Sequence, residues 1–225
     1  MLSKVTSMRE QKSAGVRGPY AKSAQRASDI LDVAATVFAT HGYQGGSLRD
    51  ISRQLGLSLT SIAHHFGSKY KLLEAVLERA DRTTPGNEEF DFDAACAERG
   101  VASATLERVR SSLERPELLR LFAILAAESS APTHPAHDWF VARYRRKAKE
   151  LAAAIAHDQA MGRISPHRDP HTLSRLLIGT WDGIQLQWLI DPTADMTTSM
   201  TAFFEWALPE AMQNPQSIPG QSSAG

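Results

Sequence analysis

Apolar residues recur every three or four positions through most of this chain, which is the spacing of a helix that buries one face. The first stripe predicts a helix over 23–41, and its apolar members are Ala27, Ile30, Leu31, Ala34, Val37 and Phe38. Similar stripes predict helices over 47–55, 58–66, 68–82, 93–114, 116–128, 135–161, 171–190 and 196–208. The sequence therefore predicts an all-α fold of about nine helices, with a break at Gly100.

The stretch 47–70 predicts two short helices joined by a tight turn and followed by the start of a third. Ser47 and Asp50 have the spacing of a capping box, in which the serine hydroxyl accepts from the Asp50 N–H and the aspartate reaches back to the Ser47 N–H. Gly56 suits the left-handed conformation that ends a helix, and Ser58 can cap the next one. The apolar residues of the motif are Ile51, Leu55, Leu57, Ile62 and Phe66. This is the sequence pattern of a DNA-reading helix-turn-helix.

The outward residues of the second helix are short and polar, as contacts to base edges in a major groove require. They are Thr60, Ser61 and His64. An ordinary helical hairpin with a solvated face has the same pattern, so the motif alone leaves that alternative open. Adjacent helical residues point about 100° apart, so His64 and His65 are not expected to share a metal ion.

Charge is divided unevenly along a chain whose formal net charge is zero. Residues 1–82 hold 12 of the 25 Lys and Arg residues but only 7 of the 25 Asp and Glu residues. The front of the chain is therefore basic and the rear acidic, which predicts that only the front touches phosphate. We interpret residues 1–22 as a flexible basic arm, from which Arg17 and Lys22 could reach the DNA backbone or minor groove. A solubilising tail is the alternative.

Residues 23–80 resemble the DNA-binding domain of the TetR family of transcriptional regulators. The resemblance is carried by His41-Gly42-Tyr43, Ser47-Leu48-Arg49-Asp50-Ile51, Gly56-Leu57-Ser58 and His64-His65-Phe66-Gly67-Ser68-Lys69, with Arg17-Gly18-Pro19-Tyr20 as a similar lead-in. It implies that Ser47, His65 and Lys69 hold phosphates and that Arg49, Thr60, Ser61 and His64 lie near the groove. The whole predicted DNA-binding set is Arg17, Ser47, Arg49, Ser58, Thr60, Ser61, His64, His65 and Lys69. The chain departs from the family at Ala63, where many members carry a phosphate-contacting tyrosine.

The resemblance also implies the organisation of the chain. We expect an N-terminal three-helix helix-turn-helix domain over 23–82, a helical effector-binding and dimerisation domain over 88–208, and a disordered tail over 209–225. Thr83-Thr84-Pro85-Gly86-Asn87 reads as the loop between the two domains.

The segment 171–190 is apolar on nearly every face, which a peripheral helix of a monomer does not need. Gly179 and Gly183 would let another helix approach closely. We predict a four-helix dimer interface formed with 196–208 and the same segments of a second chain. Its predicted residues are Gly179, Gly183, Ile184, Gln187, Met200, Phe203 and Phe204. A buried helix in a larger monomeric core is the alternative.

The family resemblance further implies a small-molecule inducer that releases a palindromic operator. Candidate pocket residues combine apolar side chains with a few polar ones, as ligand sites do. They are Phe122, Leu125, Glu128, Trp139, Tyr144, Trp181 and Gln185. The sequence does not identify the ligand.

Other classes of function have weaker signals. We find no Gly-rich phosphate loop, no nucleophile motif and no metal set, so no catalytic residue, cofactor or metal is predicted. The pairs His134/His137 and His167/His171 have ligand-like spacing but lie beside prolines. The single cysteine, Cys96, and the lack of a signal peptide or membrane span indicate a cytoplasmic protein. The alternatives are a helical small-molecule-binding protein or enzyme with an incidental hairpin, and a DNA-binding protein without an effector.

Overall fold

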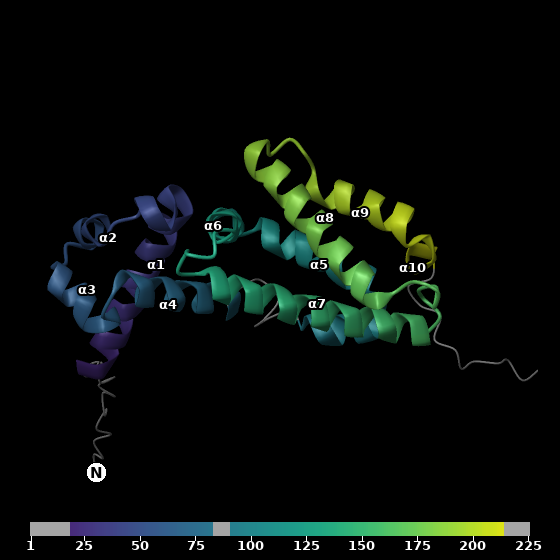
Figure 1. Ribbon diagram of the computed structural model, residues 1–225, viewed down its shortest axis with the longest axis horizontal. Helices are drawn as coiled ribbons and strands as arrows, with labels where there is room; N and C mark the ends of the chain where they lie inside the picture. The colour runs from purple at the N-terminus through teal and green to yellow at the C-terminus, as the bar shows by residue number, and fades with distance from the viewer. Residues whose placement is uncertain (1–18, 83–90, 214–225) are drawn as a thin grey trace, which may run out of the picture.

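The structure is a computed structural model that describes residues 19–82 and 91–213, and those residues form ten α-helices. The helices are α1 (Pro19–Gly45), α2 (Leu48–Leu55), α3 (Leu59–Phe66), α4 (Lys69–Arg82), α5 (Phe92–Leu113), α6 (Pro116–Glu128), α7 (His137–Ala160), α8 (Pro170–Ile190), α9 (Met196–Ala207) and α10 (Pro209–Gln213). Helices α1–α4 gather at one end of an elongated molecule, and α8–α10 lie toward the other (Figure 1). The predicted all-α fold class is confirmed, with one helix more than expected.

The two predicted terminal segments are each wrong over a few residues. Helix α1 begins at Pro19, so residues 19–22 are helical although we expected them in the flexible arm. Proline is well tolerated in the first turn of a helix, where its missing N–H costs nothing. Residues 209–213 form α10 instead of the start of a disordered tail, because Ala211 is buried against the neighbouring helices. Arg17, the rest of both segments and the loop 83–87 lie outside the described residues.

A first hydrophobic core holds α1–α4 together and extends beyond them. Its fully buried members from the N-terminal helices include Ile30, Phe38, Ile51 and Ile62. Leu121 and Leu125 of α6, together with Phe140 of α7, belong to the same cluster. Helix α6 therefore packs directly on the helix-turn-helix domain, although it belongs to the predicted effector domain in sequence.

A second core lies among α5, α7, α8, α9 and α10. Met200 and Phe204, which we predicted at a dimer interface, are fully buried here within their own chain. That part of the prediction is wrong, because the apolar face of α9 packs against α5 and α8. Phe203 and Ile184 are half-buried against the same core, whereas Gly179, Gly183 and Gln187 are exposed.

Helix α5 bends where the sequence predicted a break. Gly100 has φ 83° and ψ 160°, a left-handed region that L side chains rarely adopt. The Val101 N–H that follows donates to the Asp158 carboxylate at 2.8 Å. Asp158 is fully buried, and Arg163 Nε donates to its other oxygen at 3.0 Å. This buried ion pair fixes the bend of α5 against α7.

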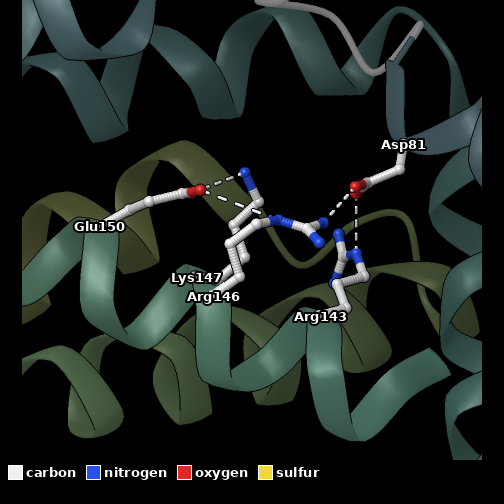
Figure 2. Close-up of polar contacts among 5 residues, drawn as sticks. All are labelled: Asp81, Arg143, Arg146, Lys147 and Glu150. Carbon is white, nitrogen blue, oxygen red and sulfur yellow. Dashed lines mark hydrogen bonds and ion pairs between the residues drawn. The ribbon is translucent and has the colours of Figure 1, made fainter. Parts of the chain in front are cut away.

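Charged groups also join α4 to α7. Figure 2 shows Asp81, near the end of α4, facing Arg143 and Arg146 of α7. Arg143 Nε donates to Asp81 at 2.9 Å, and Arg146 donates to the second carboxylate oxygen. One helical turn further on, Lys147 Nζ lies 3.0 Å from Glu150. The end of α4 is therefore tied to the helix that runs through the second half of the chain.

Across residues 19–82 and 91–213, none of the helices combines the length and the apolar character that crossing a membrane requires.

Candidate nucleic-acid interface and ligand cavity

The turn between α2 and α3 has the geometry of a helix-turn-helix. Ser47 caps α2, and its hydroxyl accepts from the Asp50 N–H at 3.1 Å. The reciprocal bond differs from the predicted one, because the Asp50 carboxylate accepts from the Ser47 hydroxyl itself at 2.6 Å. This bond, with a smaller contribution from Arg53, lowers the pKa of Asp50. Gly56 has φ 62° and ψ 29°, which confirms the predicted left-handed end of α2.

The predicted DNA-binding residues differ in how exposed their side chains are and in whether a helix cap already uses their hydroxyl groups. Arg49, Thr60 and His64 are exposed on α2 and α3, while Ser61 and His65 are half-buried. Ser58 is exposed, but its hydroxyl already accepts from the Ser61 N–H at 3.1 Å. Ser47 is likewise engaged in a cap. Ala63 is also exposed on α3. The surface thus offers a few short side chains on a rigid, capped frame.

Lys69 is placed differently from the other candidates. It opens α4, and its Nζ lies 4.4 Å from the centre of the Tyr43 ring. Burial lowers the pKa of Lys69, and the nearby Glu128 carboxylate partly opposes that shift. Glu128 also accepts from the Tyr43 N–H at 2.7 Å. Lys69, a candidate contact to DNA phosphate, is therefore held against the ring of Tyr43, whose backbone N–H bonds α1 to α6.

Two exposed residues beside this surface escaped the sequence-based interpretation. Tyr70 and Lys71 lie in the first turn of α4, and the Ser68 hydroxyl accepts from the Lys71 N–H at 3.1 Å. Both side chains contact Glu74, with the Tyr70 hydroxyl donating at 2.5 Å and Lys71 Nζ at 3.0 Å. The signal that could have found them is the Ser68 cap, because a capped helix start presents N–H groups and a positive dipole end to phosphate.

A cavity of about 290 Å³ lies among α5, α6, α7 and α8. Four of the seven predicted pocket residues line it, namely Phe122, Tyr144, Trp181 and Gln185. The other three do not. Leu125 is fully buried in the first core, Glu128 turns to Tyr43, and Trp139 stacks on Phe122 with ring centres 6.2 Å apart.

Part of the polar wall of the cavity satisfies itself. The Tyr144 hydroxyl donates to Asp182 at 2.8 Å, and burial raises the pKa of both groups. Trp181 Nε1 donates to the Gln185 side chain at 2.8 Å, whose Nε2 donates to the Leu119 carbonyl at 3.1 Å. These bonds orient α8 against α6 and α7.

The opposite wall contains three polar residues that sequence reasoning missed. Thr105, Arg108 and Ser112 line the cavity from α5. Their spacing of three and four residues places them on one face of the helix. That spacing was the available signal. When a helix otherwise packs against apolar neighbours, a polar stripe along it indicates that this face meets something other than solvent.

The His134/His137 pair bonds to a loop of its own chain. His134 Nδ1 lies 2.9 Å from the Ser129 hydroxyl, and His137 Nδ1 lies 2.8 Å from the Ser129 carbonyl. Within the described ranges, no three His, Cys, Asp or Glu residues gather in a way that could hold a metal ion.

With this geometry in view, comparison with known proteins identifies the N-terminal domain. Residues 30–76 match the family model described as "Bacterial regulatory proteins, tetR family". These residues form a DNA-binding domain of the TetR family. The chain is 24% identical over 166 residues to the A-factor receptor protein of Streptomyces griseus, covering 74% of the chain and 56% of that protein. It is 37% identical over 89 residues to the HTH-type transcriptional repressor AcnR of Corynebacterium efficiens, covering 40% and 41%.

Solved structures share the fold of this chain over most of its length. SmeT, the repressor of the Stenotrophomonas maltophilia multidrug efflux pump SmeDEF, is similar with a TM-score of 0.64 and 17% identity, covering 88% of this chain and 97% of that one. The SmeT–triclosan complex gives a TM-score of 0.66 at the same identity, covering 88% and 99%. The two named sequence relatives are matched over only about half of their own length.

Proposed function

We propose that this chain is a homodimeric transcriptional repressor that binds a palindromic operator and releases it when a small molecule enters the cavity. One observation carries this function: helix α6 lines the cavity with Leu119 and Phe122 and also buries Leu121 and Leu125 in the core of the helix-turn-helix domain. A ligand against α6 therefore touches the frame that holds α3. No catalytic residue is assigned.

DNA recognition would divide between position and sequence. Thr60 and His64 lie one turn apart on the exposed face of α3, where short side chains can approach base edges. Ser47, His65 and Lys69 would hold the backbone, with Arg17 reaching from the N-terminal side. Neutralising about 6–10 phosphates would make the affinity fall steeply with salt.

Dimerisation would use a stripe on the outside of α8 and α9. Leu176, Leu186 and Ile190 are 56%, 52% and 77% exposed, and Trp206 of α9 is 82% exposed. Gly179 lies between them on α8, and a Cβ atom added to it would meet open space. Large apolar side chains exposed together on one face mark an association surface. A two-fold axis through this stripe would pair the α3 helices of two chains for adjacent turns of one duplex.

The relatives make a ligand-controlled repressor a reasonable expectation for this chain. AcnR and SmeT are named as repressors, the A-factor protein is named as a receptor, and SmeT has been solved with triclosan. To act as a switch here, the effector must bind the DNA-incompetent arrangement better by about 1–3 kcal/mol.

A selection experiment tests the DNA-binding part. The full chain is mixed with random-sequence duplexes at low salt, and bound fragments are sequenced. We expect an inverted repeat whose half-sites lie about 10 base pairs apart or a multiple of that. Enrichment of a single unrepeated site, or of no sequence, would contradict the proposed function.

Sedimentation tests the assembly. We expect a dimer for the wild type and a monomer for Ile190→Glu, since a buried unpaired carboxylate would oppose the contact. Arg110→Glu, on an exposed position of α5 outside the stripe, is the control and should remain dimeric. If Ile190→Glu remains a dimer, as Arg110→Glu should, α8 is not the interface.

A further inference from the structure

We propose that the effector is a small apolar carboxylic acid, whose carboxylate binds the α5 groups Thr105, Arg108 and Ser112. This inference rests on the proposed function, because it names the class of ligand for the same cavity.

The first observation is a pair of buried hydroxyls without a partner. Thr105 and Ser112 are 4% and 1% exposed, and both line the cavity. Within the described part of the chain, neither Thr105 Oγ1 nor Ser112 Oγ has a hydrogen-bond partner. Leaving a buried polar group unsatisfied costs about 1–3 kcal/mol. Two such groups on one wall indicate that a ligand with acceptor atoms completes them.

The second observation is the cation between them. Arg108 follows Thr105 by three residues and precedes Ser112 by four, so the three side chains share a helix face. Its guanidinium lies 5.2 Å from the centre of the Phe92 ring, and no described residue accepts a hydrogen bond from it or forms an ion pair with it, since the Asp81 and Glu150 carboxylates act on it only from farther away. A guanidinium stays charged in proteins and is expensive to remove from water without an anion.

The remaining charged groups around the cavity already have partners. Arg143 pairs with Asp81, Lys147 pairs with Glu150, and Asp182 accepts from Tyr144. Figure 2 shows the first two of these pairs turned toward α4 and along α7. Arg108 is therefore the cation that the structure leaves for a ligand.

The rest of the cavity sets the body of the ligand. Its wall includes the apolar side chains of Phe92, Leu119, Phe122, Leu151, Leu177 and Ile178. A volume of about 290 Å³ is at the small end of ligand pockets, which span roughly 300–1,000 Å³. A carboxylate fits the polar end because its oxygens can accept two parallel bonds from a guanidinium and still accept from both hydroxyls.

Binding of matched probes to the full chain tests this assignment. The probes are straight-chain carboxylates from octanoate to tetradecanoate and 2-naphthoate, each compared with its methyl ester and its alcohol by calorimetry. We expect at least one acid to bind, and to bind roughly 10–100-fold more tightly than its ester or alcohol, which is the value of a charged hydrogen-bonded contact.

Three variants assign the preference to α5. Arg108→Gln should abolish the acid-over-alcohol ratio while retaining alcohol binding, and Thr105→Val and Ser112→Ala should each reduce the ratio several-fold. Arg110→Gln removes the same charge from an exposed position two residues away and should leave the ratio unchanged. A merely structural role of Arg108 would lower the affinity for acid and alcohol alike.

Failure of this inference is separable from failure of the proposed function. Equal binding of acid and alcohol, no binding of any acid, or an unchanged ratio in Arg108→Gln would overturn it. The same preparations are titrated with the selected duplex. Duplex binding without a carboxylate preference would leave the repressor function standing, whereas a carboxylate preference without duplex binding would remove the repressor and keep the acid site.

Discussion

The α2–α3 surface and the α5 wall of the cavity both present short polar side chains, but they differ in who satisfies them. On the surface, the Ser47 and Ser58 hydroxyls accept from helix-start N–H groups. In the cavity, Thr105 and Ser112 have no partner among the described residues. Water solvates an exposed group until DNA replaces it, whereas a buried group must obtain its partner from the fold or from a ligand. The surface is therefore complete before it binds, and the cavity is not.

The largest expected effect is a loss of stability at the bend of α5, the helix that forms one wall of the cavity. Asp158→Ala removes the acceptor that the Val101 N–H and Arg163 share, leaving a buried cation unpaired. We expect a loss of about 3–5 kcal/mol in unfolding free energy by denaturant titration. Asp158→Asn retains an acceptor and should lose less. Equal stability of the alanine variant and the wild type would contradict the role given to this pair in bending α5.

Next in size are the contacts of the surface with DNA. Thr60→Ala should change the preference for one base pair by about 1–3 kcal/mol, because a base-edge contact is lost. Lys69→Ala should weaken binding to all sequences alike and reduce the salt slope by about one. Competition binding with single-base variants of the selected duplex measures both effects. A uniform loss in both variants would remove Thr60 as a reader.

A smaller effect tests whether the surface hydroxyls act as caps. Ser58→Ala removes the hydroxyl that accepts from the Ser61 N–H, which keeps only the Ser58 carbonyl at 3.0 Å, and should cost about 0.5–2 kcal/mol of stability. Ser58→Asn can cap the helix equally well and should restore most of the loss. Thermal unfolding followed by circular dichroism measures both variants. Loss of DNA binding in the asparagine variant at normal stability would instead make Ser58 a direct contact.

The smallest expected effect is a pH dependence at the junction between the regions. Burial lowers the pKa of His134. The Glu128 carboxylate, which lies 3.6 Å from His134 Nε2, opposes this shift only in part. The unfolded chain therefore takes up this proton at a higher pH than the folded chain does, so stability falls as the pH drops below about 6.5. His134→Gln should show a shallower loss of stability between pH 7 and pH 5. A steeper loss in the variant would reverse the sign of this contribution.

Local signals explain why the helix-turn-helix was predictable. Ser47, Gly56 and Ser58 act on their own chain neighbours, so their roles follow from spacing alone. The bend at Gly100 was readable for the same reason. One detail of the Ser47 cap was predicted wrongly. The Asp50 carboxylate accepts from the Ser47 hydroxyl and not from the Ser47 N–H, because the hydroxyl competed with the backbone N–H.

The cavity and the association surface depend on packing between remote segments, and the sequence predicted them less well. Helix α9 is apolar on more than one face, and its contacts with α5 and α8 decide that Met200 turns inward while Trp206 stays exposed. Glu128 was predicted to line the pocket, but its carboxylate accepts from the Tyr43 N–H of α1 instead. Arg108 was overlooked because polar positions in a helix are usually solvated.

The most direct test of the central claim is the number of chains bound to one operator. The selected duplex, and a copy with one half-site scrambled, are titrated with the full chain, and the mass of each complex is measured by sedimentation. We expect two chains on the intact palindrome and an affinity at least about tenfold lower for the half-scrambled duplex. One chain bound to either duplex with equal affinity would contradict a paired repressor.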